Sequence, residues 1–290
     1  MFANYLIHIL ITVGYYLILV LSLNLTLGYS GILNLGHVAF FAVGAYTSAI
    51  LTKSGLPFVA SFLLAGLMGG VFGFFVALFT KRLKGDYIAL ATLGFSFVVL
   101  SFINNLRFLT RGPYGIAGIE KPNIFGWQIH SNVGYLVFVS VMVLLCFLLL
   151  YRIVHSRYGS LLQAARDDEI GLSALGKNVF RLRVQVMALS GALASIAGSI
   201  FAHYITYIHP SNFFLSDIIL IVSMVIVGGL ASLRGSVLAT FSLIFFTESV
   251  RFLPLPPGIV GPARLIIYAL LLLLILLYKP RGLFGKIDLQ

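Results

Sequence analysis

The sequence predicts an all-α integral membrane protein: a polytopic bundle of about nine transmembrane helices, within a range of eight to ten. Hydrophobic residues make up 60% of its 290 residues and charged residues only 9%, and the mean hydropathy is +1.06. Such a composition lies far outside that of soluble domains. Residues 1–52 carry no charged side chain, which leaves room for two helices of the ~20 residues that cross a bilayer. Alternating ten-residue segments typical of a membrane barrel are absent, so we expect the spans to be helical.

The expected spans are apolar segments separated by glycine, proline or charged residues. They cover residues 5–27, 32–51, 58–80, 87–108, 133–151, 185–207, 213–233, 235–253 and 262–278. Only four residues separate the first two segments, so residues 32–51 are open to two interpretations, a full span or a re-entrant or broken helix. The whole chain, 1–290, is expected to form one transmembrane domain.

Lysine and arginine indicate the orientation, because cytoplasmic loops of membrane proteins accumulate them. Alternate connections hold 13 and six of these residues, and the richer group includes the loop at 152–183 and the C-terminal segment. Both are therefore expected in the cytoplasm, with the N-terminus outside for nine spans and inside for eight. The net charge of +11 is explained in this way. We expect no nucleic-acid partner, since no basic run is interleaved with aromatics in a soluble module.

The loop at 152–183 stands apart from the rest of the chain, since it holds nine of the 27 charged residues. Apolar residues recur near helical spacing from Ser160 to Leu175, Ser160 can cap the start, and Gly176 suits the left-handed position after the end. The sequence therefore predicts one amphipathic helix on the cytoplasmic face, with an acidic patch from Asp167 to Glu169. A soluble partner is the simplest reason for that patch.

No pattern of catalysis accompanies these features. The sequence has no metal-spaced histidine or cysteine cluster and no nucleophile–base constellation, so we expect no enzyme activity, no metal and no cofactor. The segment Gly171–Asn178 is one residue short of a phosphate-binding loop and has Asn178 in place of the hydroxyl that such a loop places on magnesium.

Four motifs resemble the permeases of ABC importers for branched-chain amino acids, in the family's order and over nearly the whole chain. The motifs are Ala164–Ile170 followed by Ala174–Val179, Leu27–Gly31 with Asn34–His37 and Gly44–Tyr46, Tyr87–Phe95, and Val227–Leu230 through Gly235. Of the two paired permeases in such importers, the Arg-Asp-Asp-Glu-Ile loop is similar to the LivM type. The second permease of urea importers shares much of the pattern, which leaves the substrate open.

The resemblance implies a permease subunit of a bacterial or archaeal cytoplasmic (inner) membrane with no ATPase of its own. It would pair with a homologous permease, dock two ATP-binding subunits, and pass solute inward from an extracytoplasmic binding protein. The residues that would couple the permease to the ATPases are Ala165, Arg166, Asp167, Asp168, Glu169 and Gly176. The substrate is not readable from the chain, since specificity in such systems lies largely in the binding protein.

Two further groups of residues are singled out by chemistry. Polar side chains within or beside apolar segments are candidates for a translocation pathway: Asn34, His37, Asn104 and Asn105. A pathway fed by a binding protein should attract solute only weakly, so few charges are expected there. A tight cytoplasmic turn is predicted after the seventh span, and its glycines are Gly228, Gly229 and Gly235.

A rival hypothesis from another class is an ion-coupled secondary transporter, in which Asp217 or Glu248 binds the coupling ion. Such transporters are built from inverted repeats, and no clear repeat is visible here. Each residue also has a structural alternative. Asp217 would lie at the outer boundary of the membrane, and Glu248 would form an ion pair with Arg251, three residues later on the same helix.

Overall fold

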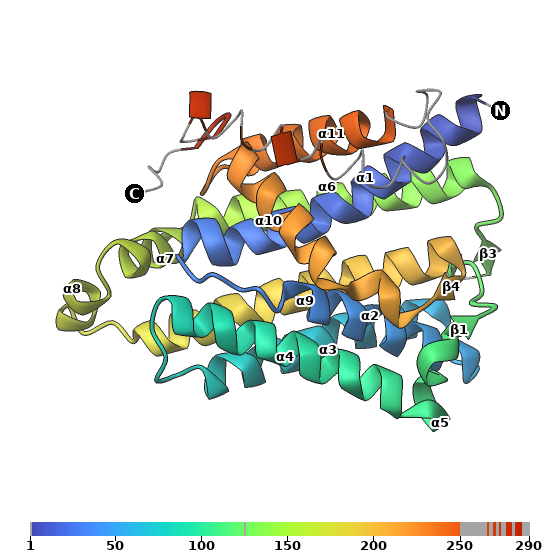
Figure 1. Ribbon diagram of the computed structural model, residues 1–290, viewed down its shortest axis with the longest axis horizontal. Coiled ribbons are helices and arrows are strands. Elements are labelled where there is room, and N and C mark those ends of the chain that lie inside the picture. The colour runs from blue at the N-terminus through green and yellow to red at the C-terminus, as the bar shows by residue number, and fades with distance from the viewer. Residues whose placement is uncertain are drawn as a thin grey trace.

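The fold is a bundle of long helices with short elements gathered at its two ends (Figure 1). The computed structural model describes residues 2–124, 126–249, 266, 269–270, 273, 277–279 and 282–285. The first helix, α1 (Phe2–Asn24), continues into a π-helical turn, η1 (Leu25–Tyr29). The other long helices are α2 (His37–Lys53), α3 (Phe58–Phe79), α4 (Asp86–Asn105), α6 (Asn132–Val154), α9 (Val179–Ile205), α10 (Leu215–Gly228) and α11 (Leu233–Ser249).

Six stretches within the described residues are long and apolar enough to cross a membrane: Ala3–Tyr29, Phe58–Phe79, Asp86–Asn105, Asn132–Val154, Val179–Ile205 and Pro210–Gly228. Two more expected spans coincide with α2 and α11, each of 17 residues. The expected span at 262–278 lies almost wholly outside the described residues. A total of nine spans therefore stays a prediction.

The first two spans are not separated by a simple turn. The expected segment 32–51 is helical only from His37, and residues 31–34 have no regular secondary structure. The helix α2 then runs to the far end of the bundle, where Lys53 Nζ donates a hydrogen bond to the Ala117 carbonyl at 2.6 Å. The structure therefore has a non-helical break followed by a helix, rather than one continuous helix over residues 32–51.

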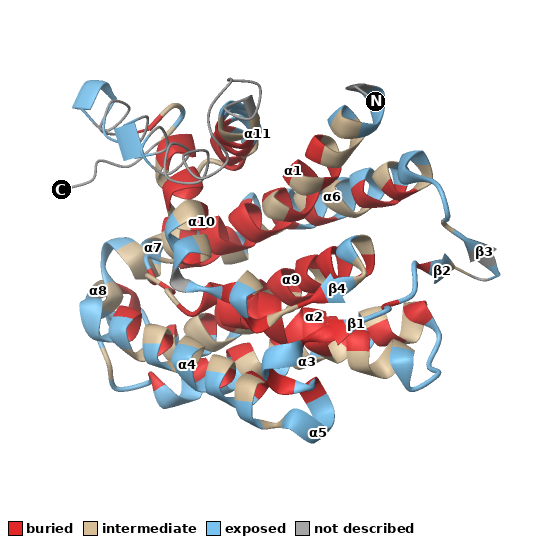
Figure 2. Cartoon of the chain, turned by 45° about the vertical axis from the view of Figure 1, so that its right-hand side comes forward, coloured by how far each residue is buried: buried red, intermediate tan, exposed pale blue. Residues whose placement is uncertain are grey.

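The core lies where α1, α2, α3 and α9 pack together, and α1, α2 and α9 are the most continuously buried (Figure 2). Small residues allow this close packing, which hydrophobic burial alone does not drive inside lipid. The hydroxyl of Ser195 in α9 donates to the Phe40 carbonyl of α2 at 2.6 Å. Gly69 of α3 lies so close to Gly191 and Ser195 that a Cβ would overlap them.

One end of the bundle carries short elements between the spans. They are α5 (Arg107–Thr110), η2 (Gly112–Tyr114), β1 (Ile116–Ala117), β2 (Asn123–Ile124), β3 (Trp127–Gln128), β4 (Tyr207–Ile208) and η3 (Pro210–Phe213). Strands β1 and β4 pair antiparallel, as do β2 and β3. The pairing of β1 with β4 ties the connection after α4 to the end of α9.

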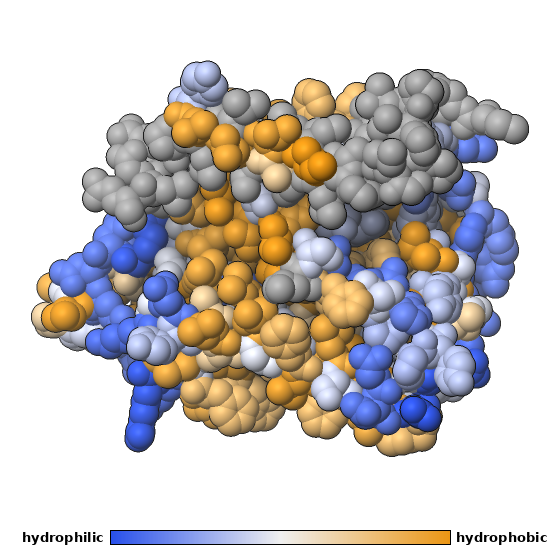
Figure 3. Space-filling model, viewed as in Figure 1, coloured by the Kyte–Doolittle hydropathy of each residue, from blue (hydrophilic) through white to orange (hydrophobic). Residues whose placement is uncertain are grey.

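The opposite end gathers the connections predicted as cytoplasmic. Arg183 of α9 donates to the Leu83 carbonyl at 3.3 Å, which places the α3–α4 connection beside the start of α9. The Leu283 N–H donates to the Val227 carbonyl at 2.8 Å, so part of the C-terminal segment lies there too. Hydrophilic residues cover both ends in the space-filling view, and a hydrophobic band lies between them (Figure 3). The described members of the two predicted charge groups thus lie at opposite ends.

Candidate functional site

Two short helices, α7 (Arg157–Asp167) and α8 (Glu169–Ala174), lie between α6 and α9 at this second end (Figure 1). The prediction of one helix from Ser160 to Leu175 is wrong, because the helix breaks at Asp168, whose backbone is extended (φ −151°, ψ 95°). The Asp168 carboxylate accepts the Gly171 N–H at 2.9 Å and caps α8. A short carboxylate favours a cap over a helix interior, because it competes for backbone N–H groups.

The boundaries of the charged loop also change. Since α6 extends to Val154 and α9 begins at Val179, residues 155–178 form the connection, rather than 152–183. Asn178 caps α9 by accepting the Arg181 N–H at 2.9 Å. The asparagine that argued against a phosphate-binding loop therefore has a structural role.

Arg166, near the end of α7, joins this segment to the membrane bundle. Its Nη1 donates a hydrogen bond to the Gly28 carbonyl oxygen of η1 at 2.8 Å. Its methylene groups cover Gly31, which has a positive φ of 69°, and a Cβ at Gly31 would lie 2.5 Å from Arg166 Cγ. Glycine is therefore required at position 31 for both reasons.

The three acidic residues of the predicted patch have different surroundings. Asp167 is exposed and accepts from Arg166 Nε at 2.9 Å and Nη2 at 2.8 Å. Asp168 is the cap of α8. Glu169 lies 3.5 Å from Arg183 Nη2, and this ion pair holds the start of α8 against α9.

The inner face of α7 packs on the bundle. Leu162 is buried and Ala165 is half-buried. The Tyr158 hydroxyl donates to the Leu182 carbonyl at 3.5 Å. Burial raises the pKa of Tyr158 to about 12, so the phenol stays protonated as a donor near neutral pH.

The outer face of α8 is open and mostly apolar. Ile170 and Leu175 are each 77% exposed. Gly176 follows the helix with a φ of 75°, which confirms the predicted left-handed position, and nothing lies within 4 Å of where its Cβ would be. Exposed hydrophobic side chains beside carboxylates mark a surface suited to a protein partner.

Asn34 and His37 lie together at the break before α2, and both are fully buried. Ser22 Oγ donates to the Leu19 carbonyl, so His37 Nε2, 2.9 Å from that hydroxyl oxygen, is the donor in their hydrogen bond. Asn34 Oδ1 accepts the Gly36 N–H at 2.9 Å. Within the described chain, Asn34 Nδ2 and His37 Nδ1 have no hydrogen-bond partner.

Asn104 and Asn105 do not join them. Each amide donates to its own helix, Asn104 to the Leu100 carbonyl at 2.9 Å and Asn105 to the Ser101 carbonyl at 2.8 Å. The break before α2 contacts α4 at Thr92, since the Leu35 N–H donates to Thr92 Oγ1 at 3.0 Å. Twelve residues of helix separate Thr92 from Asn104, about 18 Å. The four predicted pathway residues therefore form two separate pairs.

The predicted glycine turn is a close backbone contact between α10 and α11. A Cβ at Gly228 would overlap Gly235, and the reverse holds as well. Gly229 has a φ of 101°, so the residue types at this turn are explained by geometry. Ala231 also has a positive φ, 58°, which is costly for a residue with a side chain.

Asn24, which the sequence analysis did not single out, holds that turn. Its Oδ1 accepts the Ala231 N–H at 3.1 Å, and its Nδ2 donates to the Ser232 carbonyl at 3.1 Å and Ser236 Oγ at 2.7 Å. An amide inside an uncharged apolar segment was the available signal, because a buried polar group in a membrane must find a partner.

Asp217 and Glu248 are half-buried at the end of the bundle away from α7 and α8. Asp217 is in the first turn of α10, and Glu248 Oε2 accepts the Tyr5 hydroxyl at 2.8 Å. Arg251, the predicted ion-pair partner of Glu248, lies outside the described residues. Among the residues that the structure describes, no three histidine, cysteine or acidic side chains form a metal-binding group.

These features define a class: a mostly helical, multi-pass membrane protein with a polar segment between two of its spans. The chain belongs to the family described as "Branched-chain amino acid transport system / permease component", whose pattern matches residues 5–277.

Individual relatives agree. The chain is 32% identical to the high-affinity branched-chain amino acid transport system permease protein LivM of Escherichia coli strain K12, over 92% of this chain and 67% of the relative. It is 26% identical to a probable branched-chain amino acid transport permease protein LivM of Methanocaldococcus jannaschii, over 96% and 92%. It is 24% identical to the autoinducer 2 import system permease protein LsrC of Yersinia pseudotuberculosis, over 73% and 60%. No solved structure matches.

Proposed function

We propose that the chain is the transmembrane permease subunit of an ATP-driven ABC importer for branched-chain or related hydrophobic amino acids. It pairs with a homologous permease, receives solute from an extracytoplasmic binding protein and is driven by two separate ATP-binding subunits. In this proposal α7 and α8 form the coupling segment, and ATP hydrolysis takes place on the partners.

The observation that carries the proposal is a set of hydrogen bonds that links α7 to η1 and, one turn earlier in the same span, links α1 to the α10–α11 turn. Arg166 contacts Gly28, and one helical turn earlier Asn24 contacts Ala231 and Ser232 of the α10–α11 turn. A shift of α7 by an ATPase would therefore act on η1, α1 and the α10–α11 turn together. Packed helices respond to such a force by moving between discrete arrangements.

The open face of α8 suits the ATPase side of this contact. Ile170 and Leu175 supply apolar area, and Asp167 and Asp168 supply negative charge. A short helix that presents apolar residues to a groove is a common mode of recognition. Ala165 and Glu169 face inward and hold the segment to the bundle.

The break before α2 is the proposed inner part of the pathway. Asn34 Nδ2 and His37 Nδ1 lack partners in the described chain, and a buried polar group without one costs ~1–3 kcal/mol. A passing polar solute or water would satisfy them for a moment. Asn104 and Asn105 are proposed for the outer part, near the short elements that would face the binding protein.

The names of the relatives support a branched-chain amino acid as solute. A urea or amide importer is the alternative, which the similarity of the two permease types leaves open. Competition separates them: excess leucine or valine should abolish uptake of labelled leucine by the assembled importer, whereas urea should have no effect. Competition by urea alone would favour the alternative.

Two substitutions test the coupling segment. Glu169→Arg places two positive charges together at Arg183, and Gly176→Val strains a left-handed position. Both should abolish uptake while the protein still inserts in the membrane. Gly176→Asn is the matched control, since asparagine tolerates that conformation, and it should retain uptake. Normal uptake with both disruptive variants would contradict the coupling role.

The source of energy is tested separately. Uptake should stop when ATP is depleted with the ion gradient clamped, and persistence would favour an ion-coupled carrier that uses Asp217 or Glu248. Purification from native membranes should also yield two ATP-binding subunits and a second permease. A chain that purifies alone yet transports would overturn the proposed assembly.

A further inference from the structure

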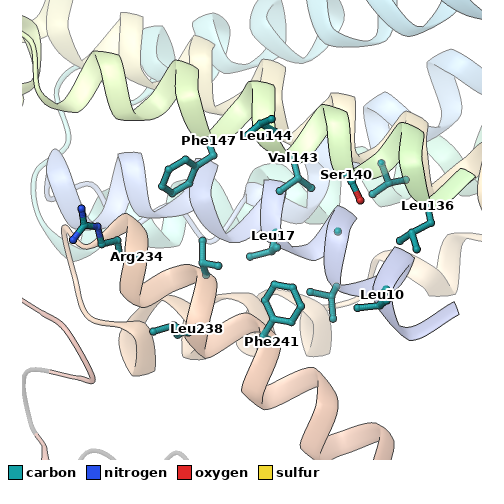
Figure 4. Close-up of a pocket in the computed structure, with 14 residues that line it drawn as sticks. Leu10, Leu17, Leu136, Ser140, Val143, Leu144, Phe147, Arg234, Leu238 and Phe241 are labelled. Carbon is teal, nitrogen blue, oxygen red and sulfur yellow. The ribbon is translucent and has the colours of Figure 1, made fainter. Parts of the chain in front are cut away.

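A hydrophobic groove runs along the outside of α1, α6 and α11, apart from the proposed pathway (Figure 4). Its volume is about 620 Å³. Except for Ser140 and Arg234, every described side chain that lines it is a hydrocarbon or a glycine. Arg234 lies at one end, and Leu10 and Phe241 lie away from it (Figure 4).

A second, polar pocket of about 340 Å³ adjoins the end marked by Arg234, and the two share Phe147 and Arg234. The polar pocket is lined by groups able to donate hydrogen bonds, including Tyr29, Tyr151, His155 and Gln163. No acidic side chain lines either cavity among the described residues. One site thus has an apolar part and an electropositive, hydrogen-bonding part.

The Arg234 guanidinium is the group of the polar pocket that is available to an anionic ligand. The His155 ring lies at 32° to Tyr151 with 4.1 Å between centroids, and its Nδ1 donates to the Tyr151 carbonyl at 2.8 Å, so the neutral ring presents Nε2 as an acceptor. Arg234 is exposed and makes no hydrogen bond or ion pair with the described residues. A guanidinium without such partners suits a phosphate, which it can bind with two N–H groups.

The dimensions of the groove fit lipid chains. On α6 its lining runs from Leu136 to Phe147, 11 helical steps, or about 17 Å of helix. The hydrocarbon of one leaflet is about 15 Å deep, half of the bilayer core. A docked helix ~10 Å wide over that length would occupy about 1,300 Å³, roughly twice the groove. An acyl chain is thinner than a helix and fits the groove. The polar pocket then remains available for the headgroup.

We propose that the groove and its polar pocket bind one anionic phospholipid of the cytoplasmic leaflet, with the phosphate at Arg234 and an acyl chain between α1, α6 and α11. Basic pockets between spans on the cytoplasmic side commonly recognise anionic headgroups. Arg234 begins α11 beside the turn that Asn24 holds, and Gln163 belongs to α7. The bound lipid would therefore lie beside both α7 of the proposed coupling segment and the α10–α11 turn.

The test uses native mass spectrometry of the protein purified in mild detergent and titrated with phosphatidylglycerol or phosphatidylcholine. We expect one phosphatidylglycerol per chain, with phosphatidylcholine at least about tenfold weaker. Arg234→Gln should weaken phosphatidylglycerol binding by about tenfold. Arg82→Gln is the control, since Arg82 is exposed at the same end on the α3–α4 connection and should leave binding unchanged.

The apolar part is tested with a second pair of variants. Ser140→Phe fills the groove and should abolish the bound lipid. Val137→Phe adds the same ring to an exposed position of α6 outside the groove and should have no effect. Equal binding by Arg234→Gln and the wild type, equal binding of both lipids, or retention in a folded Ser140→Phe protein would overturn the proposal.

Discussion

The Arg166 guanidinium donates a hydrogen bond to the Gly28 carbonyl across 2.8 Å, and it is the direct polar link between α7 and the first span. The Arg166 side chain is only 17% exposed, so water competes weakly for this contact. Gly28 in turn lies against Asn24, which holds the α10–α11 turn. A residue of the polar segment thus reaches into the transmembrane architecture.

Replacing Arg166 should uncouple transport from ATP hydrolysis. Arg166→Ala removes the bond to Gly28 and leaves a carbonyl without its donor, a loss of about 1–3 kcal/mol in that contact. We expect uptake by reconstituted importer to fall about tenfold or more while ATPase subunits still bind. Arg166→Lys should be intermediate, because lysine keeps the charge but not the planar fork. Wild-type uptake by Arg166→Ala would rule out this contact as a link.

Variants at Gly31 and Gly55 form a matched pair that distinguishes disturbed packing against Arg166 from backbone strain. Both have positive φ, 69° and 92°, but a Cβ meets Arg166 at Gly31 and nothing within 4 Å at Gly55. Alanine should therefore strain both backbones by roughly 1–2 kcal/mol, and only Gly31→Ala should also reduce uptake. Transport assays at equal membrane levels check this. Equal losses in both variants would assign the effect to backbone strain alone.

Asn24→Ala should destabilise the bundle. It removes three hydrogen bonds and leaves the buried Ala231 N–H unpaired, for which we expect a loss of about 2–4 kcal/mol. Thermal unfolding in detergent measures the change. Asn105→Ala, on an exposed position with bonds only to its own helix, is the control and should lie within about 0.5 kcal/mol of wild type.

Variants at Ile170 and Leu172 distinguish the docking of a partner on α8 from the packing of α8 on the bundle. Ile170 is 77% exposed and Leu172 only 6%. Ile170→Ser should leave thermal stability unchanged and weaken co-purification of the ATP-binding subunits. Leu172→Ser should lower stability by about 2–4 kcal/mol, because it removes a buried side chain. Unchanged subunit binding by Ile170→Ser would contradict docking on this face.

Much of the fold was predictable because a membrane restricts the chain. The helices from Phe58 to Ile205 follow the apolar segments, since a lipid-exposed backbone must satisfy its own hydrogen bonds. The ends of the bundle follow the distribution of lysine and arginine. Gly176 was predicted in the left-handed conformation it adopts, because few other residues accept it.

The rest depends on contacts between distant residues, which local patterns do not contain. Asp168 is a local exception, since it sits at a plausible helical position but caps a new helix by accepting the Gly171 N–H at 2.9 Å. Asn24 contacts a turn more than 200 residues away. Asn34 and Asn104 looked equivalent as polar residues, but the break that holds Asn34 meets α4 at Thr92, about 18 Å of helix away from Asn104.

The π-helical turn η1 has a consequence for the register of the first span. A π-turn holds one residue more than an α-helical turn, so Leu25–Tyr29 acts as an insertion between Asn24 and the segment that Arg166 contacts. Deleting a single residue there would restore regular winding without disturbing the preceding helix. It would also move the Gly28 carbonyl relative to Asn24 and to its donor Arg166. The number of residues in this turn, and not only their side chains, therefore positions the contact with Arg166.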